Sequence, residues 1–104
     1  MIEIIVVEDD EILRNSLAVL IDDTDGFSCV NTYQDCESAI ENLEADLPDV
    51  ILMDIELPGM SGIEGTAKIK QKLPEVEIIM LTIHEDNESV FESLRNGASG
   101  YLVK

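Results

Sequence analysis

Five short apolar runs alternate with stretches of helical periodicity along the whole chain, and this alternation constrains the fold more than any other feature. The runs begin at Ile2, Phe27, Val50, Glu77 and Tyr101. Short apolar runs bounded by turn residues are typical of buried strands in a parallel sheet. Strands that alternate strictly with helices predict an α/β fold, in which helices cover both faces of the sheet.

The expected strands span residues 2–7, 27–33, 50–54, 77–81 and 101–104, and the less apolar second strand is expected nearer a sheet edge. The expected helices run from about residue 10 to 22, then around Ala39, Ile40 and Leu43, from Ile63 to a stop at Pro74, and around Val90, Phe91, Leu94 and Ala98. No helical segment follows the fifth strand. We therefore interpret the chain as a fragment whose sheet is bare on the side of the first helix, a surface that could drive association.

Size and charge exclude several classes of protein. A length of 104 residues with 45% hydrophobic content predicts one globular domain. No apolar run approaches the ~20 residues of a membrane span, and the chain opens without a signal peptide, so we expect a cytoplasmic protein. The formal net charge of −17 disfavours direct binding to nucleic acid and favours cations such as Mg²⁺, although solubility alone explains most of the acids. Cys29 and Cys36 fit free thiols in a reducing compartment.

Polar side chains stand where the apolar strands end. Glu8 and Asp9 follow the first strand, Asp54 ends the third, Thr82 follows the fourth and Lys104 ends the fifth. Because parallel strands place their carboxyl ends at one edge of the sheet, where open α/β sheets bind ligands, we expect these side chains to converge.

Each of these residues also has an ordinary structural explanation. Asp9 or Asp10 could cap the first helix, Asp54 could be a strand-end acid, and Thr82 could cap the next segment. Lys104 could be a surface lysine. Capping uses only one acid of the first group, however, and the set of five at one edge favours a functional site.

The chemistry of such a site follows from its charges. Three neighbouring carboxylates need a cation or raised pKa values, and Mg²⁺ suits an open site of carboxylates and waters completed by a phosphate. An aspartate beside Mg²⁺ can act as the nucleophile toward a phosphoryl group, giving an aspartyl-phosphate. Lys104 would pair with one phosphoryl oxygen and the Thr82 hydroxyl would donate to another.

The chain resembles the receiver domain of two-component response regulators. The resemblance rests on Val6-Val7-Glu8-Asp9-Asp10, on residues 52–62 (Leu-Met-Asp-Ile-Glu-Leu-Pro-Gly-Met-Ser-Gly), on Leu81-Thr82 and on residues 97–104 (Gly-Ala-Ser-Gly-Tyr-Leu-Val-Lys). It implies a flavodoxin-like, doubly wound, five-stranded sheet in the order 2-1-3-4-5. It also implies that residues 1–104 form one receiver domain, truncated after the fifth strand with its last helix missing.

The resemblance assigns a role to each site residue. Asp54 would accept a phosphoryl group from a sensor histidine kinase, and Mg²⁺ would be held by Glu8, Asp9, Asp54 and the backbone carbonyl of Glu56. Thr82 and Lys104 would bind the phosphoryl group, and Thr82 with Tyr101 would form the conformational switch. For Tyr101, an edge-strand aromatic that covers the core is an equally good interpretation.

Two further residues border the expected route of a hydrolysing water. Glu56 and His84 lie two positions beyond Asp54 and Thr82 and could set the lifetime of the phosphoryl group. An exposed loop histidine without such a role is the simpler interpretation of His84.

The ending of the chain is similar to receivers of the LuxR/NarL type. This similarity implies a transcription regulator that binds DNA only through a helix-turn-helix domain absent from this chain. A homodimer is possible. The domain itself would be a switch rather than an enzyme, since it would catalyse only its own phosphorylation and dephosphorylation.

Three rival readings are weaker. Phosphatases with an aspartate nucleophile carry Asp-x-Asp after the first strand, whereas this chain has Asp54-Ile55-Glu56 on the third. A flavodoxin-type flavin carrier needs a Ser/Thr/Gly-rich loop where this chain has Glu8-Asp9-Asp10, which would repel a phosphate. A degenerate receiver used only for docking would lack some of the required side chains.

Overall fold

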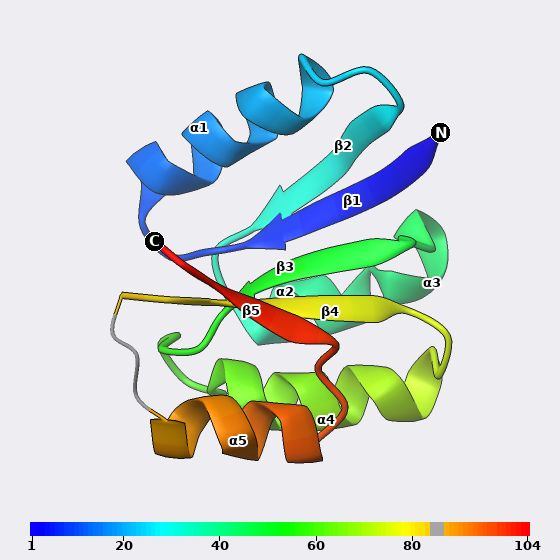
Figure 1. The fold of residues 1–104 in the computed structure, drawn as a ribbon. Helices are drawn as coiled ribbons and strands as arrows, with labels where there is room; N and C mark the ends of the chain where they lie inside the picture. The colour runs from blue at the N-terminus through cyan, green and yellow to red at the C-terminus, as the bar shows by residue number, and fades with distance from the viewer. Residues whose placement is uncertain (84–86) are drawn as a thin grey trace.

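The computed structural model describes residues 1–83 and 87–104 and contains the expected five-stranded parallel sheet. Its strands are β1 (Ile2–Val7), β2 (Phe27–Tyr33), β3 (Val50–Asp54), β4 (Glu77–Thr82) and β5 (Gly100–Val103). They pair in parallel in the order β2-β1-β3-β4-β5 (Figure 1). The expected α/β class and strand order are confirmed, and β2 lies at an edge.

Helices flank the sheet on both sides. Helix α1 (Glu11–Asp22) lies on one face, and α2 (Cys36–Glu41), α4 (Gly62–Lys72) and α5 (Asn87–Arg95) lie on the other (Figure 1). Helix α3 (Leu43–Asp46) is a short turn that follows α2. Among the described residues no helix is long and apolar enough to cross a lipid bilayer.

The second expected helix is divided, so the described chain has five helices where the sequence predicted four. The division falls at Asn42, whose side-chain amide donates to the carbonyl of Ser38 at 2.9 Å. This side chain takes the acceptor that the Asn42 N–H would use in a continuous helix, and that N–H bonds to the carbonyl of Ala39 instead. The last helix also ends earlier than expected, at Arg95 rather than near Ala98.

Alternation along the strands divides the apolar side chains between two layers. Ile51 and Met53, both fully buried, belong to the larger core, which lies on the side of α2 and α4. Val6 and Ile21 belong to a smaller core beneath α1. On that same side, Leu102 of β5 is 53% exposed.

The start of α4 is fitted closely against the end of β3. Ser61 caps this helix by accepting a hydrogen bond from the N–H of Glu64 at 3.2 Å. A Cβ atom at Gly62 would lie 2.0 Å from the carbonyl oxygen of Asp54, so only glycine permits this approach. The start of α4 therefore packs directly against the backbone of the residue that closes β3.

Candidate functional site

The predicted convergence at the carboxyl edge of the sheet is present in the structure. Ligand oxygens of Glu8, Asp9 and Asp54 all lie within 4.8 Å of one another. Glu8 is fully buried and Asp54 is 5% exposed, whereas Asp9 is exposed. Asp10 is the N-cap of α1 and accepts from two N–H groups of that helix, which leaves Glu8 and Asp9 available for the site.

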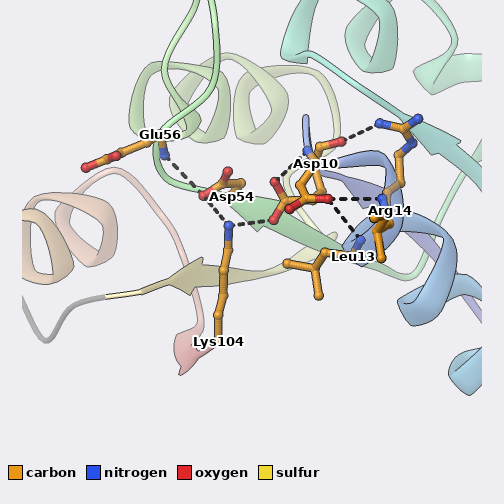
Figure 2. A network of polar contacts seen from close by, with 8 residues as sticks. Asp10, Leu13, Arg14, Asp54, Glu56 and Lys104 are labelled. Carbon is orange, nitrogen blue, oxygen red and sulfur yellow. Dashed lines mark hydrogen bonds and ion pairs between the residues drawn. The ribbon is translucent and has the colours of Figure 1, made fainter.

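Lys104 enters the same cluster from the end of β5. Its Nζ lies 2.5 Å from Oε1 of Glu8 and 3.2 Å from Oδ1 of Asp54 (Figure 2). The N–H of Lys104 donates to the carbonyl of Thr82 at 2.7 Å, so pairing with β4 directs the side chain toward the acids. Among the described residues, Lys104 therefore pairs with two of the three clustered carboxylates, those of Glu8 and Asp54.

Main-chain hydrogen bonds hold the acidic side chains in place. The N–H of Asp10 donates to Oε2 of Glu8 at 3.2 Å, and the N–H of Glu56 donates to Oδ1 of Asp54 at 3.3 Å (Figure 2). The N–H of Ile55 donates to the carbonyl of Leu81, which continues the β3–β4 pairing one residue past Asp54. Each buried carboxylate is thus held by an N–H group in the segment that directly follows its own strand.

The two buried carboxyl groups of the cluster differ in their pKa values. Burial opposes the charge on Glu8, but hydrogen bonds from Lys104 and from the Asp10 N–H outweigh it and hold the pKa of Glu8 below its usual value. Burial and the neighbouring Glu8 raise the pKa of Asp54 from 3.8 to about 7, against the influence of Lys104. Burial opposes the charge on Lys104 too, yet Glu8 and Asp54 raise the pKa of Lys104 above its usual value. Asp54 is therefore the acid that accepts a proton near neutrality when no other cation is present.

A cavity of about 870 Å³ opens over these residues. The cavity is lined by Asp54, Glu56, Thr82 and Lys104, and also by Leu13 of α1. The donor atoms are hard carboxylate oxygens with more negative charge than Lys104 alone offsets. This set fits Mg²⁺, which prefers one or two carboxylates together with waters and phosphate oxygens.

The remaining predicted site residues are placed differently. Thr82 is 9% exposed and reaches the cavity. Tyr101 is 43% exposed on β5 and is not among the residues that line the cavity. Glu56 is exposed at the cavity wall. His84 lies outside the described residues.

Sequence reasoning missed one residue that contacts the site. Arg14 Nη1 donates to the carbonyl of Glu8 at 2.9 Å (Figure 2). A signal was present in the sequence, because Arg14 shares the inward stripe of α1 with Leu17, Ala18 and Ile21 at helical spacing. A charged residue in an otherwise apolar stripe indicates a specific buried partner.

The sequence matches a known family over nearly its whole length. Residues 4–104 match the response regulator receiver domain. The chain belongs to this family, whose members are switch domains of response regulators.

The relatives and solved structures are receivers of the LuxR/NarL type and related regulators. The transcriptional regulatory protein LnrK of Bacillus subtilis (strain 168) is 39% identical over 104 residues, which are 100% of this chain and 47% of that protein. DegU of Brevibacillus brevis is 38% identical over 99% of this chain and 44% of its own length. This chain thus spans about half the length of these relatives.

Two solved structures share the fold closely. The crystal structure of a LuxR-family response regulator from Aurantimonas sp. SI85-9A1 has a TM-score of 0.93 at 32% identity, covering 98% of this chain and 73% of that one. The response regulator domain of Thermotoga maritima CheB also has a TM-score of 0.93, at 35% identity, covering 100% of this chain and 78% of that one.

Proposed function

We propose that Asp54 accepts a phosphoryl group in a Mg²⁺-dependent reaction and that the domain thereby controls a transcription-regulating output. The observation that carries the proposal is the cluster at the carboxyl edge. Lys104 Nζ lies between Glu8 and Asp54, and the ligand oxygens of Glu8, Asp9 and Asp54 are within 4.8 Å of one another. Family membership supports the same role.

The chain's own residues would divide the work as follows. Glu8, Asp9, Asp54 and the backbone carbonyl of Glu56 would hold Mg²⁺, which when bound offsets negative charge on the phosphoryl oxygens. An Asp54 carboxylate oxygen would form a bond to phosphorus while the bond from phosphorus to the donor breaks and its electron pair leaves with the donor. Lys104 would pair with one phosphoryl oxygen and the Thr82 hydroxyl would donate to another.

Asp54 must be ionised to act as the nucleophile. Its raised pKa, about 7, keeps it partly protonated without further positive charge. A bound divalent cation favours the carboxylate form, so the cation would prepare the nucleophile as well as the phosphoryl group.

Incubation with acetyl phosphate and Mg²⁺ tests this function directly. We expect the intact mass to rise by one phosphoryl group per chain, and we expect EDTA to prevent the increase. Consumption of donor should stop at one equivalent per chain, apart from slow hydrolysis of the adduct. No adduct in Mg²⁺ would contradict the proposal, and fast steady turnover of a phosphomonoester would favour the phosphatase alternative.

The same proposal includes a conformational switch between Thr82 and Tyr101. Tyr101 pairs in register with Met80, so Tyr101 projects from the face of the sheet that carries Met80 and Thr82. Movement of the Thr82 hydroxyl toward a phosphoryl group would leave space on that face for the aromatic ring. Beryllofluoride with Mg²⁺ should therefore shift the amide resonances of Tyr101 and of α5, and shifts confined to the neighbourhood of Asp54 would contradict the switch.

The wider assignments stay predictions. A sensor histidine kinase would supply the phosphoryl group, and Glu56 and His84 would set its lifetime. The relatives LnrK and DegU are named transcriptional regulatory proteins, which supports DNA binding through a domain beyond the half of their length that this chain spans. The cytoplasmic location and the possible homodimer expected from the sequence also stay predictions.

A further inference from the structure

We propose that Arg14 is a positioning residue of the acidic site, which fixes the turn after β1 so that Glu8 and Asp9 are presented to a divalent cation. The inference rests on the proposed function, because it assumes that these carboxylates bind a metal ion. It assigns to α1 a part in metal binding that does not require any of its side chains to touch the ion.

The contacts of Glu8 support this role. Its N–H donates to the carbonyl of Tyr33 at 3.0 Å, and its carbonyl accepts from Arg14 Nη1 at 2.9 Å. Its carboxylate accepts from the N–H of Asp10 at 3.2 Å. Both backbone polar groups of Glu8 are therefore fixed, one by the edge strand β2 and the other by α1. Of these three hydrogen bonds, only the one from Arg14 has a side-chain donor, so a substitution of Arg14 can remove it.

Arg14 bonds to a neutral carbonyl although the chain is rich in acidic side chains with which it could pair. The sequence holds 23 acidic residues and 6 lysines and arginines. Within the described residues Arg14 forms no ion pair with any acid, and its guanidinium donates to a neutral main-chain carbonyl. Arg14 is half-buried on the inward side of α1, so its long stem spans from the helix to the end of β1. This arrangement ties α1 to the backbone between two metal-ligand candidates.

Positioning and simple charge predict opposite effects on metal binding. If Arg14 acted only as a nearby positive charge, its removal would strengthen the binding of a divalent cation. If Arg14 positions the turn, its removal would weaken binding, since residues that orient metal ligands typically affect affinity about 10- to 100-fold. The sign of the change therefore separates the two roles.

The test measures the binding of Mn²⁺, a paramagnetic substitute for Mg²⁺. The concentration of free Mn²⁺ is read from its electron paramagnetic resonance signal. Competition with Mg²⁺ confirms that both ions bind at the same site. We expect Arg14→Met, which keeps an unbranched stem but loses the donor, to bind Mn²⁺ about tenfold more weakly. Arg14→Gln loses the same charge but keeps an N–H donor on a shorter stem, and should fall between Arg14→Met and the unsubstituted protein. Arg95→Met is the matched control, because Arg95 carries the same charge on α5 with a side chain that is 76% exposed, and it should change the affinity less than about twofold.

Two results would overturn the inference: Mn²⁺ affinity of Arg14→Met equal to that of the unsubstituted protein, or higher. Circular dichroism establishes that each variant is folded at the titration temperature. If Arg14→Met does not fold, Arg14→Gln decides alone, and an affinity equal to or above that of the unsubstituted protein contradicts the inference. A failure of the proposed function would give a different result. If the acidic cluster does not bind metal, Asp9→Asn, which lacks a proposed ligand, would bind Mn²⁺ as weakly as the unsubstituted protein.

Discussion

Replacing Lys104 by Met is expected to lower the free energy of unfolding by about 3–5 kcal/mol in EDTA at pH 7, because the change leaves the fully buried carboxylate of Glu8 without its ammonium partner. Lys104 Nζ lies 2.5 Å from a carboxylate oxygen of Glu8, whose side chain is fully buried. The same ammonium lies 3.2 Å from Asp54. Without it, two buried acids remain in contact with no lysine to offset them. Chemical denaturation measures the loss.

The matched control is Lys68→Met, which removes the same charge from an exposed position on α4. We expect that control to change stability by less than about 0.5 kcal/mol. Mg²⁺ should restore part of the stability lost in Lys104→Met, since a divalent cation can replace the missing positive charge among the acids. A loss below about 1 kcal/mol in EDTA would mean that the ion pair contributes no more than an exposed one.

Asp54→Asn is expected to have the opposite effect and to raise the free energy of unfolding of the metal-free protein at pH 7. The increase should reach up to about 4 kcal/mol, because each unit of pKa difference between the folded and unfolded states corresponds to about 1.36 kcal/mol. Burial and Glu8 raise the pKa of Asp54 in the folded protein from 3.8 to about 7. Between these two values the folded state binds a proton that the unfolded state has lost. The contribution of Asp54 to the stability of the metal-free protein therefore falls as the pH rises from about 4 to 7, and the amide avoids this loss.

The pH dependence distinguishes this effect from a general change in packing. The advantage of Asp54→Asn should be near zero at pH 4 and fully developed above pH 7, as measured by urea denaturation in EDTA. The lowered pKa of Glu8 makes its own contribution to stability rise with pH, at the acid end of this window, and the raised pKa of Lys104 places its titration above the window. Glu8 is present in both proteins, so the comparison between them isolates Asp54. The control for changing an acid to an amide is Glu75→Gln at an exposed position, which should change the free energy of unfolding by less than about 0.5 kcal/mol. A constant difference between Asp54→Asn and the unsubstituted protein across this range would contradict the explanation.

These opposite signs follow from a site that carries excess negative charge in the folded state. Asp54 and Glu8 are held together by the sheet although they repel each other. Mg²⁺ should stabilise the unsubstituted protein through binding to the folded state. Mg²⁺ should also reduce the difference in free energy of unfolding between the unsubstituted protein and Asp54→Asn, because the amide is a weaker ligand than the carboxylate.

The strands and the site edge could be predicted from sequence because both depend on simple periodicity. Apolar runs such as Val50–Asp54 have one plausible location in an α/β fold, the interior of a parallel sheet. Once those runs are placed, the residue that ends each strand is also placed. This is why Glu8, Asp54, Thr82 and Lys104 could be assigned to one edge without coordinates.

What could not be predicted depends on side-chain hydrogen bonds that periodicity does not reveal. The helix breaks at Asn42 because the Asn42 side-chain amide donates to the carbonyl of Ser38. This bond competes with the main-chain hydrogen bond that a continuous helix would make to the same carbonyl. The assignment of the helix cap to Asp10 rather than Asp9 required the positions of two N–H groups. The role of Arg14 depended on a carbonyl six residues away in the sequence, which only the turn brings within reach.

The most direct test of the central claim is to locate the phosphoryl group on the chain. The protein is incubated with acetyl phosphate and Mg²⁺, reduced with borohydride to convert an aspartyl-phosphate into homoserine, and mapped by peptide mass spectrometry. The predicted result is homoserine at position 54 alone, lost in EDTA and in Asp54→Asn. Homoserine at another acidic position, or an undiminished phosphoryl adduct in Asp54→Asn, would contradict the assignment of Asp54 as the phosphoacceptor.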